Sequence, residues 1–479
     1  ECVKIGGCDP SPQVILDPAK IAGPLHGFQI ADPRWSPNGR AIAFIGGLMS
    51  DQGITGGDVW IVDAKGLSAG TAPRDLTPGR PASSQWIAWG DDEHIFTCEV
   101  ANGEDRLVRF RLQGDRTSES VGTSFAPPVF TWPGAAGIGS SDHALAATAN
   151  RSLFVFQAST FTQPPEIFAA GPAARIIASS APASSDGSSG LTQLSHFNSG
   201  IKPDWGDAVS LTWSDDHFHI QGWLLLPAHY DPSKKYPLIV EVHGGPAADV
   251  ASSWNGGGGG FSPANFSNLG YFVLMPNPRG SFGQGEAFTQ ANRKDFGYGD
   301  LRDILAGVDA VAAKYPIDPN RIGITGWSYG GFMAMFAVTQ THRFRAAVAG
   351  AGISDWLSYY GENSIDQWMI PYFGASVYDD PQVYAKSSPI DFVKNATTPT
   401  LLAVGDRDGE CPAPQSFEFW HALRDLNVPT RLVVYPNEGH GFTDPAHLFD
   451  VQQRAVDWFA RYMPESGEQG NEGTREQVK

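Results

Sequence analysis

The segment over residues 321–331 constrains the fold more than any other, because it predicts a strand, a sharp turn and a helix in direct succession. A β-branched stretch runs into Gly-Trp-Ser-Tyr-Gly, and an apolar helical pattern starts near Phe332. Such a turn projects the serine hydroxyl above the carboxyl edge of a parallel sheet. Larger side chains at the flanking glycines would collide with the neighbouring strand and helix. We therefore predict that Ser328 is a catalytic nucleophile.

A serine nucleophile needs a general base, and the base needs an acid that orients it. In hydrolases built on this turn, the chain order is Ser, then Asp or Glu, then His. His440 stands between two glycines just after an apolar strand that is predicted to end at residue 435. Strand ends are where α/β sheets assemble a site, so we predict that His440 is the base. We expect surface or structural roles for the other histidines beyond the nucleophile, His342, His421 and His447.

The orienting acid is expected just after the preceding apolar strand, residues 401–404. Asp406 and Asp408 both stand there, and one of them can simply pair with Arg407. Asp355 also follows a predicted strand, but it lies only one strand beyond the nucleophile. Periodicity does not separate the first two candidates, so the residues alone leave the acid open.

A tetrahedral intermediate also needs donors for its oxyanion, since losing one costs about 10²–10³ in rate. The backbone N–H of Tyr329, next to the nucleophile, is the expected first donor. The second is expected in His243-Gly244-Gly245-Pro246, a loop that directly follows the predicted strand 238–242. The glycines at 256–260 lack the lysine and the helix start of a phosphate cradle, and we expect a flexible loop there.

The texture of the chain changes near residue 205. Before it, short β-type segments alternate with Gly, Pro, Asp and Ser clusters. Trp35, Trp89 and Trp132 mark three similar segments, spaced by roughly 40–55 residues as in the blades of a β-propeller. A plain β-sandwich is the alternative interpretation.

Beyond residue 205, apolar strands alternate with helical patterns, which is typical of a mostly parallel, doubly wound α/β sheet. The predicted strands are 238–242, 271–275, 322–325, 346–349, 401–404 and 432–435. Two helices are predicted from residues that fall on one helical face. The first face is formed by Leu301, Leu305, Val308 and Ala312, and the second by Phe332, Met335 and Phe336. We therefore predict a β-propeller-like domain over 1–204, an α/β-hydrolase domain over 205–464 and a disordered tail over 465–479, with a spacer at 177–190.

Composition excludes several classes of partner. The formal charge of −18, from 33 basic and 51 acidic residues, repels phosphate, so neither nucleic acid nor an anionic membrane is expected. No stretch approaches the roughly 18 apolar residues of a spanning helix. Cys2, Cys8, Cys98 and Cys411 fit no zinc pattern, and no cofactor is expected. Cys2 and Cys8 can either close a small loop or stay unpaired. With Glu1 at its start, we expect a processed or truncated, secreted or periplasmic rather than cytoplasmic protein.

Five motifs in order make residues 205–463 resemble the prolyl oligopeptidase family of serine peptidases, above all its dipeptidyl-peptidase and acylaminoacyl-peptidase branch. They are His243-Gly244-Gly245-Pro246, Pro276-Asn277-Pro278-Arg279-Gly280-Ser281, Gly326-Trp327-Ser328-Tyr329-Gly330-Gly331, Gly405-x-x-Asp408 and Glu438-Gly439-His440. The resemblance implies an N-terminal propeller that restricts access to the site. It also selects Asp408 as the acid and Gly245 as the second oxyanion donor.

The resemblance further implies cleavage of short peptides through an acyl-enzyme. We expect Trp327 and Glu410 to contact the substrate. Two departures stand out. The family often has a basic or amide residue and then Val-Pro after the acid, whereas this chain has Glu410-Cys411-Pro412. Glu410 thus suggests a cationic substrate group, such as a free amino terminus. Residues 1–204 have room for about four blades of ~45 residues rather than about seven, which leaves homo-oligomer formation open. The alternatives are a carboxylesterase with the same triad and an inert binding protein.

Overall fold

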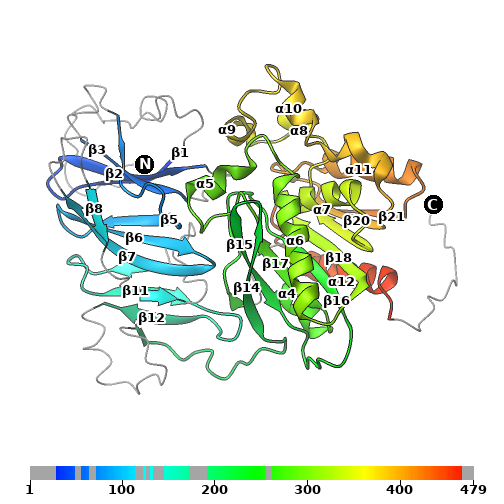
Figure 1. The fold of residues 1–479 in the computed structure, drawn as a ribbon, viewed down its shortest axis with the longest axis horizontal. Helices are drawn as coiled ribbons and strands as arrows, with labels where there is room; N and C mark the ends of the chain where they lie inside the picture. The colour runs from blue at the N-terminus through cyan, green and yellow to red at the C-terminus, as the bar shows by residue number, and fades with distance from the viewer. Residues whose placement is uncertain are drawn as a thin grey trace.

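A computed structural model describes residues 29–48, 56–63, 72–113, 122–125, 130–132, 145–171, 191–254 and 261–465. These residues form two regions that lie beside each other, a set of antiparallel sheets and an α/β region on an eight-stranded sheet (Figure 1). The predicted fold class, a propeller-like all-β part before an α/β-hydrolase part, is confirmed. Predictions for Cys2 and Cys8, for 177–190, for 256–260 and for 466–479 fall outside the described residues.

The all-β region contains three antiparallel sheets among the described residues. The first comprises β1 (Gln29–Trp35), β2 (Ala41–Gly47), β3 (Asp58–Asp63) and β4 (Arg74–Asp75). The second comprises β5 (Ser83–Trp89), β6 (His94–Ala101), β7 (Glu104–Gln113) and β8 (Gly122–Phe125), with β9 (Phe130–Trp132) paired to β7. The third comprises β10 (Leu145–Ala147), β11 (Phe154–Ala158), β12 (Glu166–Ala170) and β13 (Leu191–Gln193). The expected number of about four blades stays a prediction, because it counts residues that are not described.

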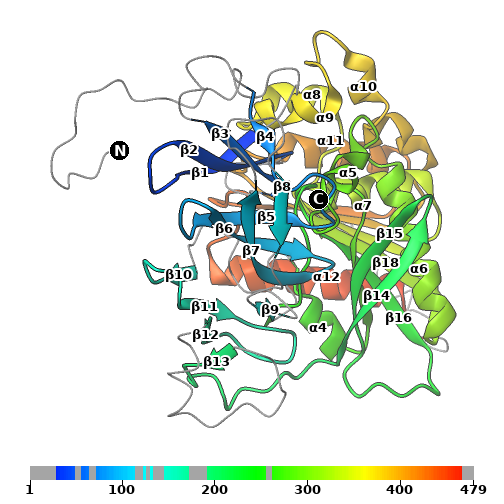
Figure 2. The same ribbon diagram turned by 60° about the vertical axis from the view of Figure 1, so that its left-hand side comes forward.

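Neighbouring sheets share their cores. Ile45 of the first sheet packs in one cluster with Ile87 and Phe110 of the second. Leu107 of the second packs with Phe154 and its neighbours on the third. Figure 2 shows the same succession of sheets from another side. Each sheet thus buries apolar side chains against the next one, as stacked blades do.

The tryptophan markers fit this arrangement only in part. Trp35 and Trp89 end the first strands of the first and second sheets, as expected for equivalent positions. Trp132 instead ends β9, which pairs with β7 inside the second sheet. The third repeat was therefore placed wrongly, because the third sheet starts later, at β10. A tryptophan marks a strand, but it does not tell which partner that strand pairs with.

The α/β region is built on one sheet in the order β14-β15-β17-β16-β18-β19-β20-β21. Its strands are β14 (Ala208–Asp215), β15 (Phe218–Leu225), β16 (Tyr236–Val242), β17 (Phe272–Asn277), β18 (Ile317–Trp327), β19 (Ala346–Gly350), β20 (Thr400–Gly405) and β21 (Thr430–Tyr435). From β17 to β21 all neighbours are parallel, while β14 and β15 join at one edge as an antiparallel pair. All six predicted strands are present, and the antiparallel pair had not been predicted.

Helices cover both faces of this sheet. On one face lie α6 (Gly299–Lys314), α7 (Tyr329–Gln340), α8 (Trp356–Glu362), α9 (Met369–Phe373), α10 (Pro381–Ala385) and α11 (Ala413–Asp425). On the other lie α4 (Pro263–Asn268) and α12 (Pro445–Tyr462). Proline in the first turn starts α4, α10, α11 and α12, where the missing N–H costs nothing. Short turns add α5 (Glu286–Thr289), η2 (Gln290–Asn292), η3 (Asp366–Trp368) and η4 (Pro389–Asn395).

Two helical faces differ from expectation. On α6 the predicted Ala312 is exposed, while Ile304 and Val311 are buried together with Leu301 and Val308. The buried stripe is therefore rotated by part of a turn, because α6 also packs against β14, a strand that was not predicted. On α7 every residue from Tyr329 to Thr339 is buried, so this helix has no solvent face to predict.

Two loops of the α/β region contact the all-β region. Gly283 receives an N–H bond from Asn102 at 3.0 Å and donates its own N–H to the Ser83 hydroxyl, also at 3.0 Å. The N–H of Trp254 donates to the Ser159 hydroxyl at 3.2 Å. These loops follow β17 and β16, and the loop after β16 also contains the predicted site residue Gly245, so the all-β region contacts a loop that contributes to the candidate site.

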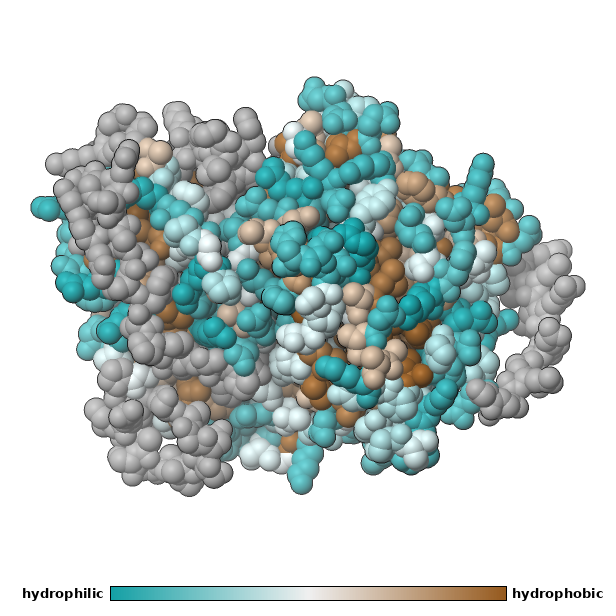
Figure 3. Space-filling model, in the orientation of Figure 1, coloured by the Kyte–Doolittle hydropathy of each residue, from teal (hydrophilic) through white to brown (hydrophobic). Residues whose placement is uncertain are grey.

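Hydrophilic residues cover most of the described surface on the face shown in Figure 3, with apolar residues scattered among them. Among the described residues, none of the helices has both the length and the apolar character to cross a bilayer.

Candidate active site

Ser328 occupies a strained turn between β18 and α7. Its backbone has φ 63° and ψ −121°, a region that costs about 1–3 kcal/mol for a side chain other than glycine. The turn is held by its own N–H, which donates to the Gly350 carbonyl at 3.0 Å. A Cβ at Gly326 would come within 2.5 Å of the Val242 carbonyl oxygen, and one at Gly330 would come closer still. Both glycines are therefore required by the close approach of β16.

Asp408 and His440 form a hydrogen-bonded pair. Nδ1 of His440 lies 2.9 Å and 3.1 Å from the two oxygens of the Asp408 carboxylate. The Asp408 side chain has no exposed area, and that of His440 is 19% exposed. Asp408 Oδ1 also accepts the backbone N–H groups of Glu410 and Cys411, at 2.9 Å and 2.8 Å. The turn over 408–411 therefore fixes the direction in which the carboxylate faces the imidazole.

The other two carboxylates that the sequence offered lie elsewhere. Asp406 is exposed. Arg407 donates to the side-chain oxygen of Asn437. Asp355 caps the N-terminus of α8 by accepting an N–H bond at 3.0 Å. Of the three candidates, the structure brings Asp408 to the imidazole.

The remaining histidines have other neighbours. Nδ1 of His342 lies 3.2 Å from the Thr397 hydroxyl at an exposed position. The ring of His421 lies 4.9 Å from that of Trp420 on α11. Nδ1 of His447 lies 2.7 Å from Glu438 Oε1. None of these contacts involves the pocket described below.

Glu438 stabilises the loop that carries His440. Its carboxylate accepts the backbone N–H groups of Thr443 and Asp444, at 2.8 Å and 3.0 Å. These backbone donors and His447 lower the pKa of Glu438 to about 2, so the residue is ionised across the physiological range. The Glu-Gly-His motif therefore combines an anchor with the candidate base.

A small pocket, partly open to solvent, lies in front of Ser328. It is lined by Gly245, Ser328, Tyr329, Ile353, Tyr359, Ile365, Trp368, Glu410 and Cys411. Both predicted oxyanion donors thus lie at one pocket with the nucleophile. Gly245 has φ 118°, a conformation open to glycine, and a Cβ at Gly244 would lie 3.3 Å from that of Ser328. The glycine pair therefore lets a backbone approach the nucleophile closely.

The side chain of His243 anchors this glycine loop. Its Nε2 lies 2.8 Å from the Ser281 hydroxyl, and its Nδ1 lies 2.6 Å from the Gly244 carbonyl. Burial lowers the pKa of His243, which favours the neutral imidazole. The N–H of Phe282 donates to the Ala248 carbonyl at 2.9 Å. The loop after β16 is thereby joined to the loop after β17.

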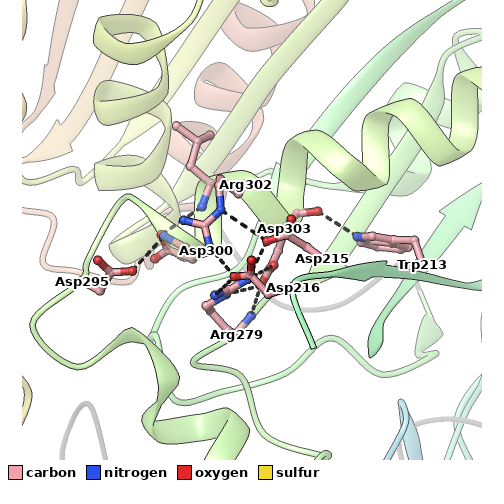
Figure 4. A network of polar contacts seen from close by, with 10 residues as sticks. Trp213, Asp215, Asp216, Arg279, Asp295, Asp300, Arg302 and Asp303 are labelled. Carbon is pink, nitrogen blue, oxygen red and sulfur yellow. Dashed lines mark hydrogen bonds and ion pairs between the residues drawn. The ribbon is translucent and has the colours of Figure 1, made fainter. Parts of the chain in front are cut away.

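Arg279 holds the loop after β17 in place (Figure 4). Its guanidinium contacts Asp303 on α6 at 2.7 Å and 2.9 Å, and Asp215 at 2.6 Å. Asp216 lies 3.0 Å from Arg279 and 2.6 Å from Arg302. Since Asp303 is fully buried, each partner compensates the desolvation of the other. The motif over 276–281 thus has a structural role, tying the edge pair β14–β15 to α6.

Trp327 supports the loop of His440 from beneath. Its indole N–H donates to the His440 carbonyl at 2.9 Å. Its ring centroid lies 5.1 Å from that of Phe442 and 5.9 Å from that of Phe261. Within the described part of the chain it is not among the residues that line the pocket. A substrate contact for Trp327 stays a prediction.

Several residues of the pocket were not found from the sequence. Cys411 is buried with Sγ 3.8 Å from Ser328 Oγ. Tyr359 and Trp368 come from α8 and η3, segments that contain no catalytic motif. Trp368 is 5% exposed, and its indole nitrogen has no hydrogen-bond partner among the described residues. The only signal for these walls was the aromatic content of 356–373.

Tyr329 makes a second contact that was missed. Its hydroxyl donates to Asp300 at 2.5 Å. Complete burial raises the pKa of Asp300 to about 7. This bond ties the start of α7, which carries the candidate oxyanion donor, to the start of α6.

Among the described residues, no cluster of His, Cys, Asp and Glu side chains is suited to a metal ion.

Comparisons with known proteins find similarity to one family over part of the chain. Residues 260–466 match the family model of the prolyl oligopeptidase family. Uncharacterized peptidase YuxL of Bacillus subtilis is 35% identical over 240 residues, 49% of this chain and 35% of that protein. Dipeptidyl-peptidase 5 of Porphyromonas endodontalis is 32% identical over 247 residues, 50% of this chain and 35% of that protein. The chain thus spans about a third of the length of these curated relatives.

A solved structure extends the likeness to both regions. The acylaminoacyl peptidase of Pyrococcus horikoshii aligns with a TM-score of 0.66 at 22% identity. The alignment covers 90% of this chain and 63% of that one. At this identity the likeness concerns the fold alone. It agrees with a propeller-like region that precedes an α/β-hydrolase region.

Proposed function

We propose that this protein is a serine peptidase that hydrolyses short peptides, since residues 260–466 match the family model of the prolyl oligopeptidase family. Ser328 is the nucleophile, His440 the general base and Asp408 the acid that orients it. One observation carries the proposal: His440 Nδ1 lies 2.9 Å from the Asp408 carboxylate, whose turn places Cys411 3.8 Å from Ser328 Oγ. The turn over 408–411 thus contacts both the imidazole and the serine, which supports the proposed triad.

The reaction is an acyl transfer. Ser328 Oγ attacks the peptide carbonyl carbon while Nε2 of His440 takes the hydroxyl proton. Asp408 holds the proton of Nδ1 and stabilises the imidazolium that forms. The imidazolium then protonates the leaving amine, and water repeats the sequence to release the acid from the acyl-enzyme. The backbone N–H groups of Gly245 and Tyr329 stabilise the oxyanion in both steps.

The pocket indicates which peptides fit. Its aromatic and aliphatic walls, Ile353, Tyr359, Ile365 and Trp368, suit an apolar side chain at the residue before the scissile bond. The all-β region lies against the loops that follow β16 and β17, which favours short peptides over folded proteins.

Two measurements test the proposal. A fluorophosphonate probe labels the wild-type protein at Ser328 and leaves Ser328→Ala unlabelled. Parallel assays with peptide anilides and simple esters then compare the two reaction classes, and a peptide-library digest read by mass spectrometry gives the cleavage positions. Hydrolysis of esters without any peptide cleavage would make the protein a carboxylesterase. A Ser328 that does not react with the probe would leave an inert binding protein.

A further inference from the structure

Glu410 is the one charged side chain among the residues that line the pocket in the described part of the chain. Its Oε2 lies 3.6 Å from His440 Nε2, on the side of the imidazole that faces away from Asp408. The Glu410 side chain is 39% exposed, so a substrate can reach it. A carboxylate therefore stands directly beside the atoms that react.

The position of Glu410 is fixed by the turn that holds the acid. Its backbone N–H donates to Asp408 Oδ1 at 2.9 Å, and Cys411 is buried next to it. Among the ion pairs of the described residues, Glu410 contacts His440 and neither a lysine nor an arginine. No neighbouring cation of this kind offsets its charge. The carboxylate is thus available to a positive group that arrives with the substrate.

Charge complementarity determines which group that is. An anionic side chain in a partly enclosed pocket attracts an ammonium group and repels the oxygen of an acyl carbonyl or a carboxylate. Given the proposed peptidase function, on which this step rests, we infer that Glu410 binds the α-ammonium group of substrates with a free amino terminus. The bound group belongs to the residue whose carbonyl Ser328 attacks, so the enzyme releases single residues.

Bond lengths support the release of a single residue. An α-nitrogen lies about 2.5 Å from the carbonyl carbon of its own residue. The attacked carbon lies about 3–3.5 Å from the nucleophile in a reactive complex. The ammonium of the first residue is therefore within about 6 Å of Ser328 Oγ, in the same pocket as Glu410. In a substrate with one more residue, the ammonium moves away by roughly one Cα–Cα step of ~3.8 Å.

An N-acylated terminus is disfavoured at the same position. The acyl group removes the positive charge and presents a carbonyl oxygen where the carboxylate stands. Leaving that oxygen unpaired against an anion costs binding energy in the ground state and in the transition state alike. We therefore expect this pocket to prefer an unblocked amino terminus. A basic or amide residue at position 410 would not favour that terminus.

The test compares three p-nitroanilides: leucyl, N-acetyl-leucyl and glycyl-leucyl. We expect the full-length protein to cleave the leucyl substrate best. Glu410→Gln is expected to lower kcat/KM for that substrate by about 10- to 100-fold, the size of one charge-assisted hydrogen bond. For the N-acetyl substrate kcat/KM should hold or rise. Asp406→Asn, which removes one charge at an exposed position two residues before the acid, is the matched control and should leave the ratio unchanged.

Each other outcome has a defined meaning. An unchanged ratio in Glu410→Gln overturns the inference, and so does an equal loss for both substrates, which would show that Glu410 acts on His440 alone. Better cleavage of the glycyl-leucyl substrate than of the leucyl one overturns the release of single residues. Fluorophosphonate labelling at the wild-type rate shows that the variant is folded. If Ser328 is labelled but no anilide is cleaved, the proposed peptidase function fails and this inference falls with it.

Discussion

The two regions of the molecule bury their apolar residues in different ways. In the α/β region one sheet is covered on both faces, and β19 and β20 are buried at every position. In the all-β region β11 alternates between buried and more open positions, and its core is completed by a second sheet. The proposed catalytic residues belong to the region with the continuous core. The stacked sheets depend on their neighbours, so they are the region in which local opening is cheaper.

The contact between the regions is acidic. The Gln85 amide of the all-β region donates to Asp249 at 3.5 Å, and burial raises the pKa of Asp249 to about 6. Glu286 on α5 approaches the end of β2, where a Cβ on Gly47 would lie 2.8 Å from its Oε1. Burial raises the pKa of Glu286 to about 7, and burial and Asp75 raise that of Asp58. This seam, defined by Asp58, Asp249 and Glu286, is held together best when its carboxyls are protonated.

The largest expected effect is on the catalytic rate, and it concerns a residue of the α/β region. Asp408→Asn should lower kcat by on the order of 10⁴, because the imidazole then takes the wrong tautomer. Steady-state kinetics on a cleaved peptide measure the loss. Asp406→Asn should be nearly silent. The opposite pattern would transfer the role of acid to Asp406.

A smaller effect is expected on the stability of the α/β region. Asp303→Ala removes the buried partner of Arg279 and should lower the free energy of unfolding by about 3–5 kcal/mol. Denaturant titration of the α/β region's transition measures it. The matched control is Asp309→Asn, which breaks the exposed pair with Arg343 at 2.6 Å and should cost less than about 1 kcal/mol. Equal losses in the two variants would mean that burial of the Arg279 network adds nothing.

The next effect concerns the stacked sheets. Leu107 is fully buried between the second and third sheets, and Leu107→Ala should cost about 3 kcal/mol. The all-β region should then unfold at lower denaturant concentration, while the fluorophosphonate still labels Ser328. The exposed Arg109→Ala should change stability by less than about 0.5 kcal/mol. If labelling of Ser328 were lost at the denaturant concentration at which the all-β region unfolds, the two regions would unfold as one unit.

The smallest effect is on the seam. Its acids have raised pKa values in the closed state, so that state binds more protons than an open one. Stabilisation is therefore complete at low pH and is lost as pH rises through about 6 to 8, by about 1–2 kcal/mol. Hydrogen exchange of the segment 278–286, corrected for the intrinsic rate, should show less protection at pH 8.5 than at pH 5.5. Glu286→Gln should reduce that difference, and undiminished pH dependence in this variant would count against the assignment.

The strands of the α/β region could be predicted because both faces are buried, which leaves short apolar runs between helical patterns. The edge pair β14–β15 was missed, since it alternates with polar residues such as Ser210 and Thr212. The place of Trp132 also failed, because pairing in antiparallel sheets depends on contacts distant in the chain. Local pattern specifies the parallel core, while the stacking of the sheets is decided by tertiary contacts.

For the candidate site, local chemistry predicted the residues that motifs contain. The order Ser328, Asp408, His440 follows from the turn and from the strands that precede each residue. Tyr359 and Trp368 could not be found this way, because helices that carry no motif bring them to the pocket. The partner of Tyr329 on α6 is likewise a matter of packing between two helices.

The left-handed backbone of Ser328 lowers the stability of the fold, while the proposed reaction requires a serine at this position. Glycine would adopt φ 63° and ψ −121° without strain, so the fold by itself is better satisfied by glycine at this position. A descendant that no longer needed its nucleophile would gain stability from the first mutation that removed it. Loss of the proposed nucleophile is thus an easy change for this turn, because a serine there costs stability that only a reactive hydroxyl would offset.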